Sequence, residues 1–230
     1  MADLVLYGTP LSPFVRKVQV VLGHTGCPYD FETVNIRAMP DWFLEISPAR
    51  RIPVIRDRTI GTEGQAGTIF DSSAISLFLD RRLNAGLFGT TPFEAGRIAA
   101  IEEYADSVLG PTVGMGIFRP ILFPRFAGKP SDLDTARKTW SETLPSIFDY
   151  LEGVLNGGAH FVGGRYSLAD IAVGCQMLQL DLVAGLPDAD RWPALVKHSE
   201  AMRLRPEFAR NLEASFQLIA GILPEKVDLR

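Results

Sequence analysis

The spacing of apolar residues changes along the first third of the chain. Residues 4–7 form an apolar run with the length and composition of a buried strand, and Gly8 and Pro10 interrupt it. Apolar residues then recur at helical spacing, and Ser12 followed by Pro13 is typical of an N-cap residue with proline at the first helical position. The pattern predicts a strand, a turn and a helix, with a hydroxyl group where the helix begins.

The following segments continue an α/β pattern. Residues 29–34 alternate as a half-buried strand does, so the first two strands should be parallel with a right-handed crossover. Residues 39–46 predict a short irregular helix. Proline lacks an N–H group, so Pro53 must open the next strand or lie at its edge. Two interpretations remain open: the unpaired backbone of Ile52 binds a peptide-like ligand, or Pro53 merely begins a strand.

A polar connection and a second strand-to-helix junction come next. Residues 56–68 contain three glycines but neither a GxGxxG pattern nor a P-loop lysine, which predicts a mobile loop rather than a phosphate-binding loop. Residues 68–70 predict a short strand, and Asp71 and Ser72 begin another helix. A carboxylate and a hydroxyl at that position are most often a helix cap, so alone they predict no chemistry.

The pattern becomes helical after a turn-rich joint at residues 84–92, which predicts two domains, 1–83 and 92–230. The first long helix should end or kink at Gly110 and Pro111. Residues 115–124 are rich in prolines and large apolar groups, which excludes a regular amphipathic helix throughout. We expect some of these side chains to line a cleft or a subunit contact.

The remaining segments predict further helices. One spans about residues 131–155 with a kink at Pro145, and a last pair spans residues 193–204 and 206–220. Between them, Ser167 and Asp170 have the spacing of the N-cap and N3 positions of a buried helix, a shorter-armed relative of the Ser-x-x-Glu capping box. We expect this pair to serve folding rather than chemistry.

The composition of the 230 residues is that of a globular protein, with 47% hydrophobic and 22% charged residues. A net charge of −4 argues against nucleic-acid and anionic-membrane partners, which require concentrated positive charge. No long apolar run or leader pattern is present, so a cytoplasmic location is expected. Cys27 and Cys175 are expected to remain reduced, and the scattered His24, His160 and His198 predict no metal site.

Four features stand in a characteristic order: Leu6-Tyr7 to Ser12-Pro13-Phe14, Arg51-Ile52-Pro53-Val54, Asp71-Ser72-Ser73-Ala74-Ile75, and Ser167-Leu168-Ala169-Asp170. Together with an α/β half followed by a helical half, they resemble the cytosolic glutathione transferases over essentially the whole chain. The resemblance implies an α/β thioredoxin-like N-terminal domain that binds glutathione as co-substrate and an all-α C-terminal domain. It also implies a cis peptide bond before Pro53 and, commonly for this family, a homodimer.

The resemblance also implies roles for individual residues. The backbone of Ile52 would pair with the cysteinyl backbone of glutathione, and Asp71 with Ser72 would hold its γ-glutamyl end. Arg51, with Arg50 as the second choice, would meet the glycine carboxylate. Two departures from the family pattern are Asp71 in place of a longer glutamate or glutamine, and the length of the loop at residues 56–68.

The residue that activates the thiol has two candidates. Members of the family use a tyrosine at the end of the first strand, or a serine or cysteine at the start of the first helix. We favour Ser12, because Ser-Pro-Phe at a helix start looks like the serine-type members, bacterial ones among them; Tyr7 is the competitor. Without a cysteine at position 12, the thiol-exchange branch of the family is disfavoured.

The resemblance predicts conjugation of the glutathione thiolate to an electrophilic, apolar small molecule whose identity the sequence does not specify. Its binding wall would include Tyr104, Val108, Met115, Phe118 and Phe123. Taken singly, each of these also fits an ordinary helical core. Two alternatives remain: a non-catalytic binding or regulatory subunit, and an isomerase or dehalogenase that uses the same thiolate, although the double-serine-cysteine pattern of the isomerase members is missing near Ser12.

Overall fold

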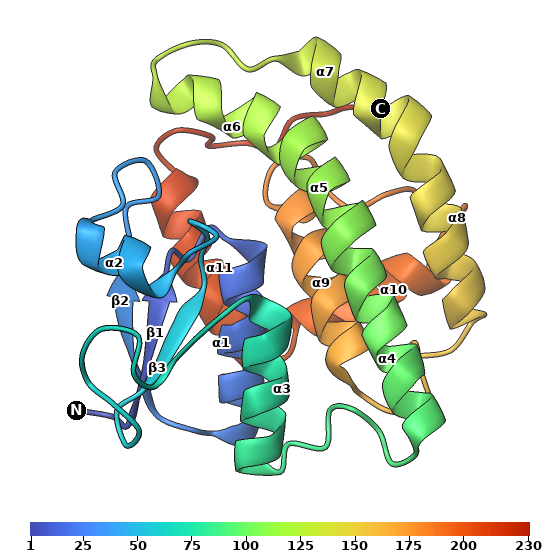
Figure 1. Cartoon of the computed structure of the whole chain (residues 1–230). Helices are drawn as coiled ribbons and strands as arrows, with labels where there is room; N and C mark the ends of the chain where they lie inside the picture. Colours follow the sequence, from blue (N-terminus) through green and yellow to red (C-terminus); the bar gives the residue numbers. More distant parts are fainter. The chain divides into compact units, whose positions relative to one another are not determined.

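The computed structural model describes residues 1–230, and the chain divides into two compact units, Met1–Gly86 and Leu87–Arg230. The division falls inside the joint predicted at residues 84–92. The first unit is an α/β fold and the second is entirely helical, which confirms the predicted fold class (Figure 1).

The α/β unit is built on a four-stranded sheet with the strand order β2-β1-β3-β4. Strands β1 and β2 are parallel, as the strand-helix-strand pattern predicts, whereas β3 is antiparallel to both β1 and β4. The elements of this unit are β1 (Leu4–Gly8), α1 (Pro13–Thr25), β2 (Tyr29–Thr33), α2 (Asp41–Ile46), β3 (Val54–Asp57), β4 (Thr68–Phe70) and α3 (Ser72–Leu83).

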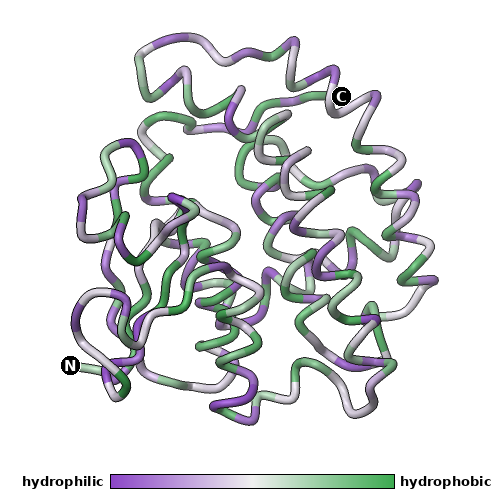
Figure 2. The backbone as a smooth tube through the Cα atoms, in the orientation of Figure 1, coloured by the Kyte–Doolittle hydropathy of each residue, from purple (hydrophilic) through white to green (hydrophobic).

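Helices cover both faces of this sheet. One apolar cluster joins the sheet to α2, and its buried members are Val5, Tyr7, Val34, Phe43, Ile46 and Val54. Because side chains alternate along a strand, Leu4 and Leu6 point to the opposite face, where α1 and α3 pack against each other (Figure 1). Apolar residues alternate with hydrophilic ones along the strands and helices of both units (Figure 2).

The second unit is helical from Pro92 to Ile219, and none of the helices is both long and apolar enough to cross a membrane. Its α-helices are α4 (Pro92–Tyr104), α5 (Gly110–Val113), α6 (Arg119–Phe126), α7 (Leu133–Lys138), α8 (Leu144–Leu155), α9 (Leu168–Asp181), α10 (Pro193–Arg203) and α11 (Pro206–Ile219). Three π-helical turns connect some of them, η1 (Ala105–Leu109), η2 (Gly114–Phe118) and η3 (Thr139–Thr143).

Each π-helical turn comes immediately before a proline inside a long helix. Pro111, Pro120 and Pro145 each occupy the second position after such a turn. A proline has no N–H and collides with the carbonyl four residues earlier, and a wider turn changes the hydrogen-bond partners just before it. Of the predicted end or kink at Gly110 and Pro111, the structure shows no end: the helix is irregular there, with a widened turn just before Gly110, and continues to Phe126.

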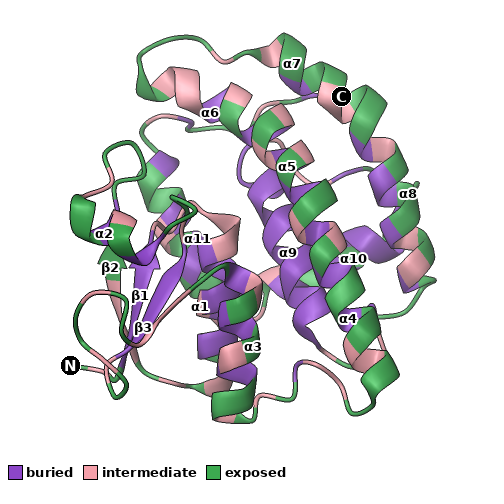
Figure 3. Ribbon diagram, viewed as in Figure 1, coloured by how far each residue is buried: buried purple, intermediate pink, exposed green.

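Helix α9 is the centre of the helical unit and is buried along its whole length (Figure 3). It packs against α4, η1 and α10. The predicted capping box is present at its start: both the N–H and the hydroxyl of Ser167 donate to Oδ2 of Asp170, at 2.8 and 2.9 Å. This pair fixes the first turn of the helix around which the others pack.

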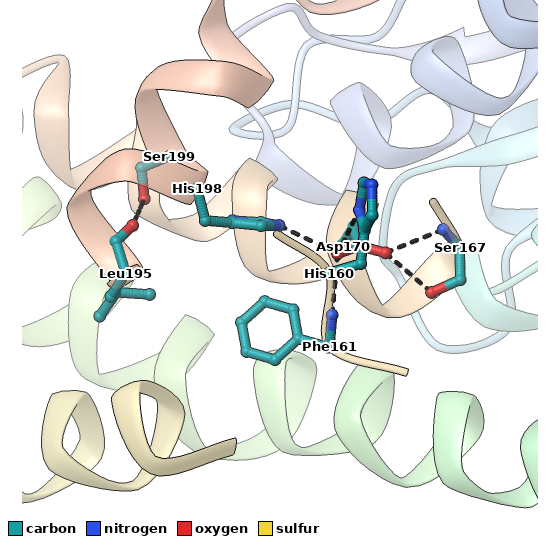
Figure 4. A network of polar contacts seen from close by, with 7 residues as sticks. All are labelled: His160, Phe161, Ser167, Asp170, Leu195, His198 and Ser199. Carbon is teal, nitrogen blue, oxygen red and sulfur yellow. Dashed lines mark hydrogen bonds and ion pairs between the residues drawn. The ribbon is translucent and has the colours of Figure 1, made fainter. Parts of the chain in front are cut away.

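The other oxygen of Asp170 holds two further segments. Oδ1 accepts the backbone N–H of Phe161 at 3.1 Å and lies 3.1 Å from Nε2 of His198 and 3.3 Å from Nδ1 of His160 (Figure 4). Burial raises the pKa of this carboxyl, but the hydrogen bond and charge of His198, the hydrogen bond from Ser167 and the charge of His160 together hold it below its ordinary value. Asp170 thus joins the start of α9 to the preceding loop and to α10.

We expect Asp170→Asn to lower the free energy of unfolding by about 2 to 4 kcal/mol at pH 7, because a buried charged acceptor of several hydrogen bonds is removed. The folded-state pKa of Asp170 is depressed. Its contribution is therefore fully present above the unfolded-state pKa of about 4 and is lost as the pH falls through the folded-state value. Urea unfolding followed at several pH values measures both effects.

The matched control is Asp190→Asn, which neutralises an exposed carboxylate in the same unit. It should leave the urea midpoint nearly unchanged. The wild-type protein and Asp170→Asn should differ less in their free energy of unfolding as the pH falls. A difference that stays constant, or widens, from neutral to acidic pH would show that the charge of Asp170 does not stabilise the fold.

Candidate functional site

The register of the sheet brings three distant segments of the chain to one end of the α/β unit. Tyr7, near the end of β1, pairs with Val54, and Val54 pairs with Phe70, the last residue of β4. The loop that leaves β1, the residues before β3 and the residues after β4 must therefore emerge at the same edge. These three segments contain all the predicted glutathione-binding residues.

Ser12 occupies the N-cap of α1, as predicted. Its backbone is extended, with φ −86° and ψ 124°, and its Oγ accepts the N–H of Val15 in a long hydrogen bond of 3.4 Å. The hydroxyl hydrogen donates to no group of the chain. Ser12 is thus a cap whose donor remains available, at the positive end of a helix dipole.

A second helix begins at the same edge of the sheet. Asp71 is the N-cap of α3, and its Oδ1 accepts the N–H groups of Ser73 and Ala74 at 2.9 and 3.2 Å. Its φ of 73° lies in a region that residues other than glycine rarely adopt, and such strain concentrates at binding sites. Oδ2 of the exposed Asp71 remains open to a cationic group, while Ser72 beside it is buried.

The segment before β3 is held by a residue that the sequence did not single out. The hydroxyl of the fully buried Ser47 accepts the N–H of Arg51 at 3.0 Å and donates to the carbonyl of Arg51 at 2.6 Å. Serine followed by proline is a common turn-forming pair, and this was the available signal in the sequence. Ser47 therefore fixes the backbone that leads into Ile52.

The residues after this turn present unpaired groups. The peptide bond between Ile52 and Pro53 is cis, which confirms what the resemblance implied. The backbone N–H and C=O of Ile52 form no hydrogen bond within the chain. The exposed side chains of Arg50 and Arg51 form no ion pair. The edge therefore offers a free main-chain donor and acceptor beside two free cations.

Tyr7 belongs to a different environment from Ser12. Its ring packs edge-on against Trp42 and Phe43 of α2, with centroid distances of 5.4 and 6.4 Å. It is part of the apolar cluster on the α2 face of the sheet. The two candidates for thiol activation thus lie on different faces of the sheet. Tyr7 points toward α2, and Ser12 begins the helix that packs on the opposite face.

The five predicted substrate-wall residues lie on the continuous helical run from α4 to α6, and they differ in exposure. Val108 and Met115 are 36% and 58% exposed, whereas Phe118 is only 5% exposed and contributes mainly to the helical core. The ring of Tyr104 lies 4.4 Å from that of Tyr150, and burial together with Tyr150 raises its pKa. Phe123 packs against Phe126 and lies under the guanidinium group of Arg119.

Other reactive side chains lie away from the edge formed by Ser12, Ile52 and Asp71. Cys27 follows the C-terminus of α1, and burial raises the pKa of its thiol; Cys175 is buried within α9, and neither cysteine is in a disulfide. No group of histidine, cysteine or acidic side chains is arranged to hold a metal ion. The edge itself combines two helix N-termini, a free hydroxyl, a free carboxylate oxygen and two arginines.

Residues 6–85 match the glutathione S-transferase N-terminal domain and residues 123–215 match the glutathione S-transferase C-terminal domain. Probable glutathione S-transferase DHAR1, cytosolic, of Oryza sativa subsp. japonica is 24% identical over 217 residues, covering 93% of this chain and 89% of that protein. Elongation factor 1-gamma of Homo sapiens is 28% identical over 207 residues, covering 84% of this chain and 44% of that protein.

A solved structure shows the same fold. The glutathione S-transferase from Rhodospirillum rubrum F11 superimposes with a TM-score of 0.79, covers 91% of each chain and is 21% identical in sequence. Both halves of the chain thus match the corresponding domains of one family, in the same order. The protein belongs to the glutathione S-transferase family.

Proposed function

We propose that the protein is a glutathione transferase that joins the thiolate of glutathione to an electrophilic carbon of an apolar small molecule. The observation that carries the proposal is the convergence of Ser12, Ile52 and Asp71 at one edge of the sheet. Each offers an uncommitted group: a hydroxyl hydrogen, a main-chain donor and acceptor, and a carboxylate oxygen.

These groups complement the parts of a γ-glutamyl tripeptide. Oδ2 of Asp71 suits its ammonium group, and the N-terminus of α3 suits the neighbouring carboxylate. The backbone of Ile52 suits the cysteinyl backbone, as main chain pairs with main chain. Arg51 and Arg50 suit the glycine carboxylate at the far end.

The hydroxyl of Ser12 and the N-terminus of α1 together can supply the free energy needed to keep the bound thiol ionised. A free thiol has a pKa of about 8.5, so about 2.7 kcal/mol of preferential stabilisation makes the thiolate predominant at neutral pH. A helix N-terminus contributes about 0.3 to 1 kcal/mol, and a hydrogen bond to a charged group about 1.5 to 3 kcal/mol. The proposal favours Ser12 over Tyr7 because the ring of Tyr7 packs against α2.

A second candidate function is binding without turnover, in a regulatory or assembly role. One relative, elongation factor 1-gamma, is named for a role other than conjugation. Calorimetric titration with glutathione, run beside a turnover assay on a panel of aromatic and alkyl electrophiles, separates the two. Saturable binding with turnover of at least one electrophile supports the transferase, and binding with no turnover supports the second candidate.

We expect Ser12→Ala to raise the pKa of bound glutathione by about 1 to 2 units, because the donor to the thiolate is removed. Its affinity for glutathione should stay nearly unchanged, because Ser12 does not contact the γ-glutamyl or glycyl ends in this proposal. The loss of the cap should cost about 1 kcal/mol of stability. Titration of the thiolate absorbance of the complex measures the pKa.

Ser12→Thr is the matched control, because it keeps both the cap and the hydroxyl, and it should titrate like the wild-type protein. Tyr7→Phe tests the competitor. If Tyr7→Phe raises the thiol pKa while Ser12→Ala leaves it unchanged, the activating role belongs to Tyr7.

We expect Ser47→Ala to weaken glutathione binding about three- to tenfold, because two hydrogen bonds that hold the backbone of Arg51 are lost. Ser47 is a positioning residue, so KM for glutathione should rise while the pKa of the bound thiol stays at its wild-type value. Steady-state kinetics and the thiolate titration provide the two readouts.

Ser199→Ala provides the comparison for this variant. It also removes a fully buried hydroxyl, one that donates to the carbonyl of Leu195 in α10 (Figure 4). An equal rise in KM for both variants would mean that the effect of Ser47 reflects general destabilisation rather than the position of the turn.

A further inference from the structure

The α/β unit contains a cleft of about 300 Å³ on the α2 face of the sheet. The strands, α2 and the loop between β3 and β4 surround it, and its lining residues are Tyr7, Glu32, Trp42, Glu45, Ile46, Arg56, Thr62, Glu63 and Gly64. It opens on the face toward which Tyr7 points; Tyr7, the competitor for thiol activation, lines it, whereas none of the residues that the proposal assigns to glutathione does.

One wall of the cleft is the loop whose length departs from the family pattern. Arg56, predicted to lie in this loop, belongs to β3 instead, and its guanidinium group donates to the carbonyls of Ala66 and Gly64, both at 2.7 Å. The side chain of Gln65 reaches across to the carbonyl of Glu45 at 3.2 Å. The loop is thus folded back onto β3 and α2, and it forms a defined wall.

The cleft carries an excess of negative charge. Glu32, Glu45 and Glu63 come from β2, α2 and the loop, and none of the three forms an ion pair within the chain. Arg56 is the cation of the lining, and its guanidinium group is held by two loop carbonyls, so three negative charges face one positive charge. Three carboxylates around one concavity favour a positively charged occupant.

The floor of the cleft adds an uncommitted polar atom. Tyr7 is 7% exposed, and its hydroxyl forms no hydrogen bond within the chain although the side chain lines the cleft. Trp42, 48% exposed, lies against the ring of Tyr7 with an interplanar angle of 60°. The exposed ring of Trp42 offers a π face and the hydroxyl of Tyr7 offers an oxygen acceptor, and cations bind to both kinds of group.

The structure assigns to this cleft the binding of an alkylammonium group, a positively charged amine carried on an apolar stem. The stem would pack against Trp42 and Ile46, and the ammonium would meet the hydroxyl of Tyr7 and the carboxylates of Glu45 and Glu63. Carboxylates alone favour an inorganic cation equally, whereas the aromatic floor favours an organic one. This site is separate from the edge that begins α1 and does not depend on the function proposed for it.

The test is a calorimetric titration of the full-length protein with 1,5-diaminopentane at low ionic strength. We expect saturable binding to one site that weakens as salt is added, because exposed charges are screened. The uncharged 1,5-pentanediol should not bind. Nα-acetyl-lysine methylamide, run in parallel, shows by its relative affinity whether the group comes from a free amine or from a lysine side chain.

We expect the double variant Glu45→Gln, Glu63→Gln to weaken diamine binding about five- to tenfold, and Tyr7→Phe to weaken it about two- to fivefold. Glu200→Gln, an exposed glutamate on α10, is the matched control and should bind like the wild-type protein. Circular dichroism confirms that each variant is folded.

Three results would overturn the assignment: no saturable binding of either amine, equal binding by the double variant and the wild-type protein, or Mg²⁺ competing as well as the diamine does. The last would identify the cleft as an unselective acidic cluster. Bound glutathione should leave diamine affinity unchanged, so a failure of this site and a failure of the proposed transferase are distinguished by separate titrations.

Discussion

The pairing of β3 with its two neighbours is the constraint on which the α/β unit depends. Because Val54 lies opposite both Tyr7 and Phe70, the end of β1, the start of β3 and the end of β4 are fixed at one edge of the sheet. A shift of one residue in this register would turn every side chain of β3 to the other face. The apolar cluster and the convergence of two helix N-termini both follow from this one alignment.

Much of this edge was predictable from the sequence because its determinants are local. Ser12 and Pro13 specify a helix start within two residues, and Ser167 with Asp170 specifies another within one turn. Ser47 could not be predicted, because its role requires its hydroxyl to meet the backbone of Arg51, a contact that only the folded turn creates. Likewise, the spacing of Asp170 predicted a cap but not its contacts with His160 and His198, which come from distant segments.

The prolines of the helical unit show how local rules can mislead. Gly110 and Pro111 suggest that a helix ends, because proline disfavours the regular hydrogen-bond pattern. The chain instead places a π-helical turn before Pro111, and does the same before Pro120 and Pro145. This adjustment keeps each helix continuous, and the first two of these turns, η1 and η2, pack against the buried α9. Tertiary packing, which no local pattern encodes, therefore decides whether such a helix continues.

The two faces of the sheet give the two candidate roles of Tyr7 different physical requirements. The ring of Tyr7 packs edge-on against Trp42 and Phe43 on the α2 face, whereas the start of α1 lies on the other face of the sheet. To receive an ammonium group in the cleft on the α2 face, the side chain can remain where it is, since its hydroxyl is already unpartnered there. Ser12 needs no rearrangement to act as a donor, because its cap uses only the acceptor side of its hydroxyl. These contacts support the proposal that Ser12 donates to the thiolate and the separate proposal that Tyr7 meets a cationic ligand on the opposite face.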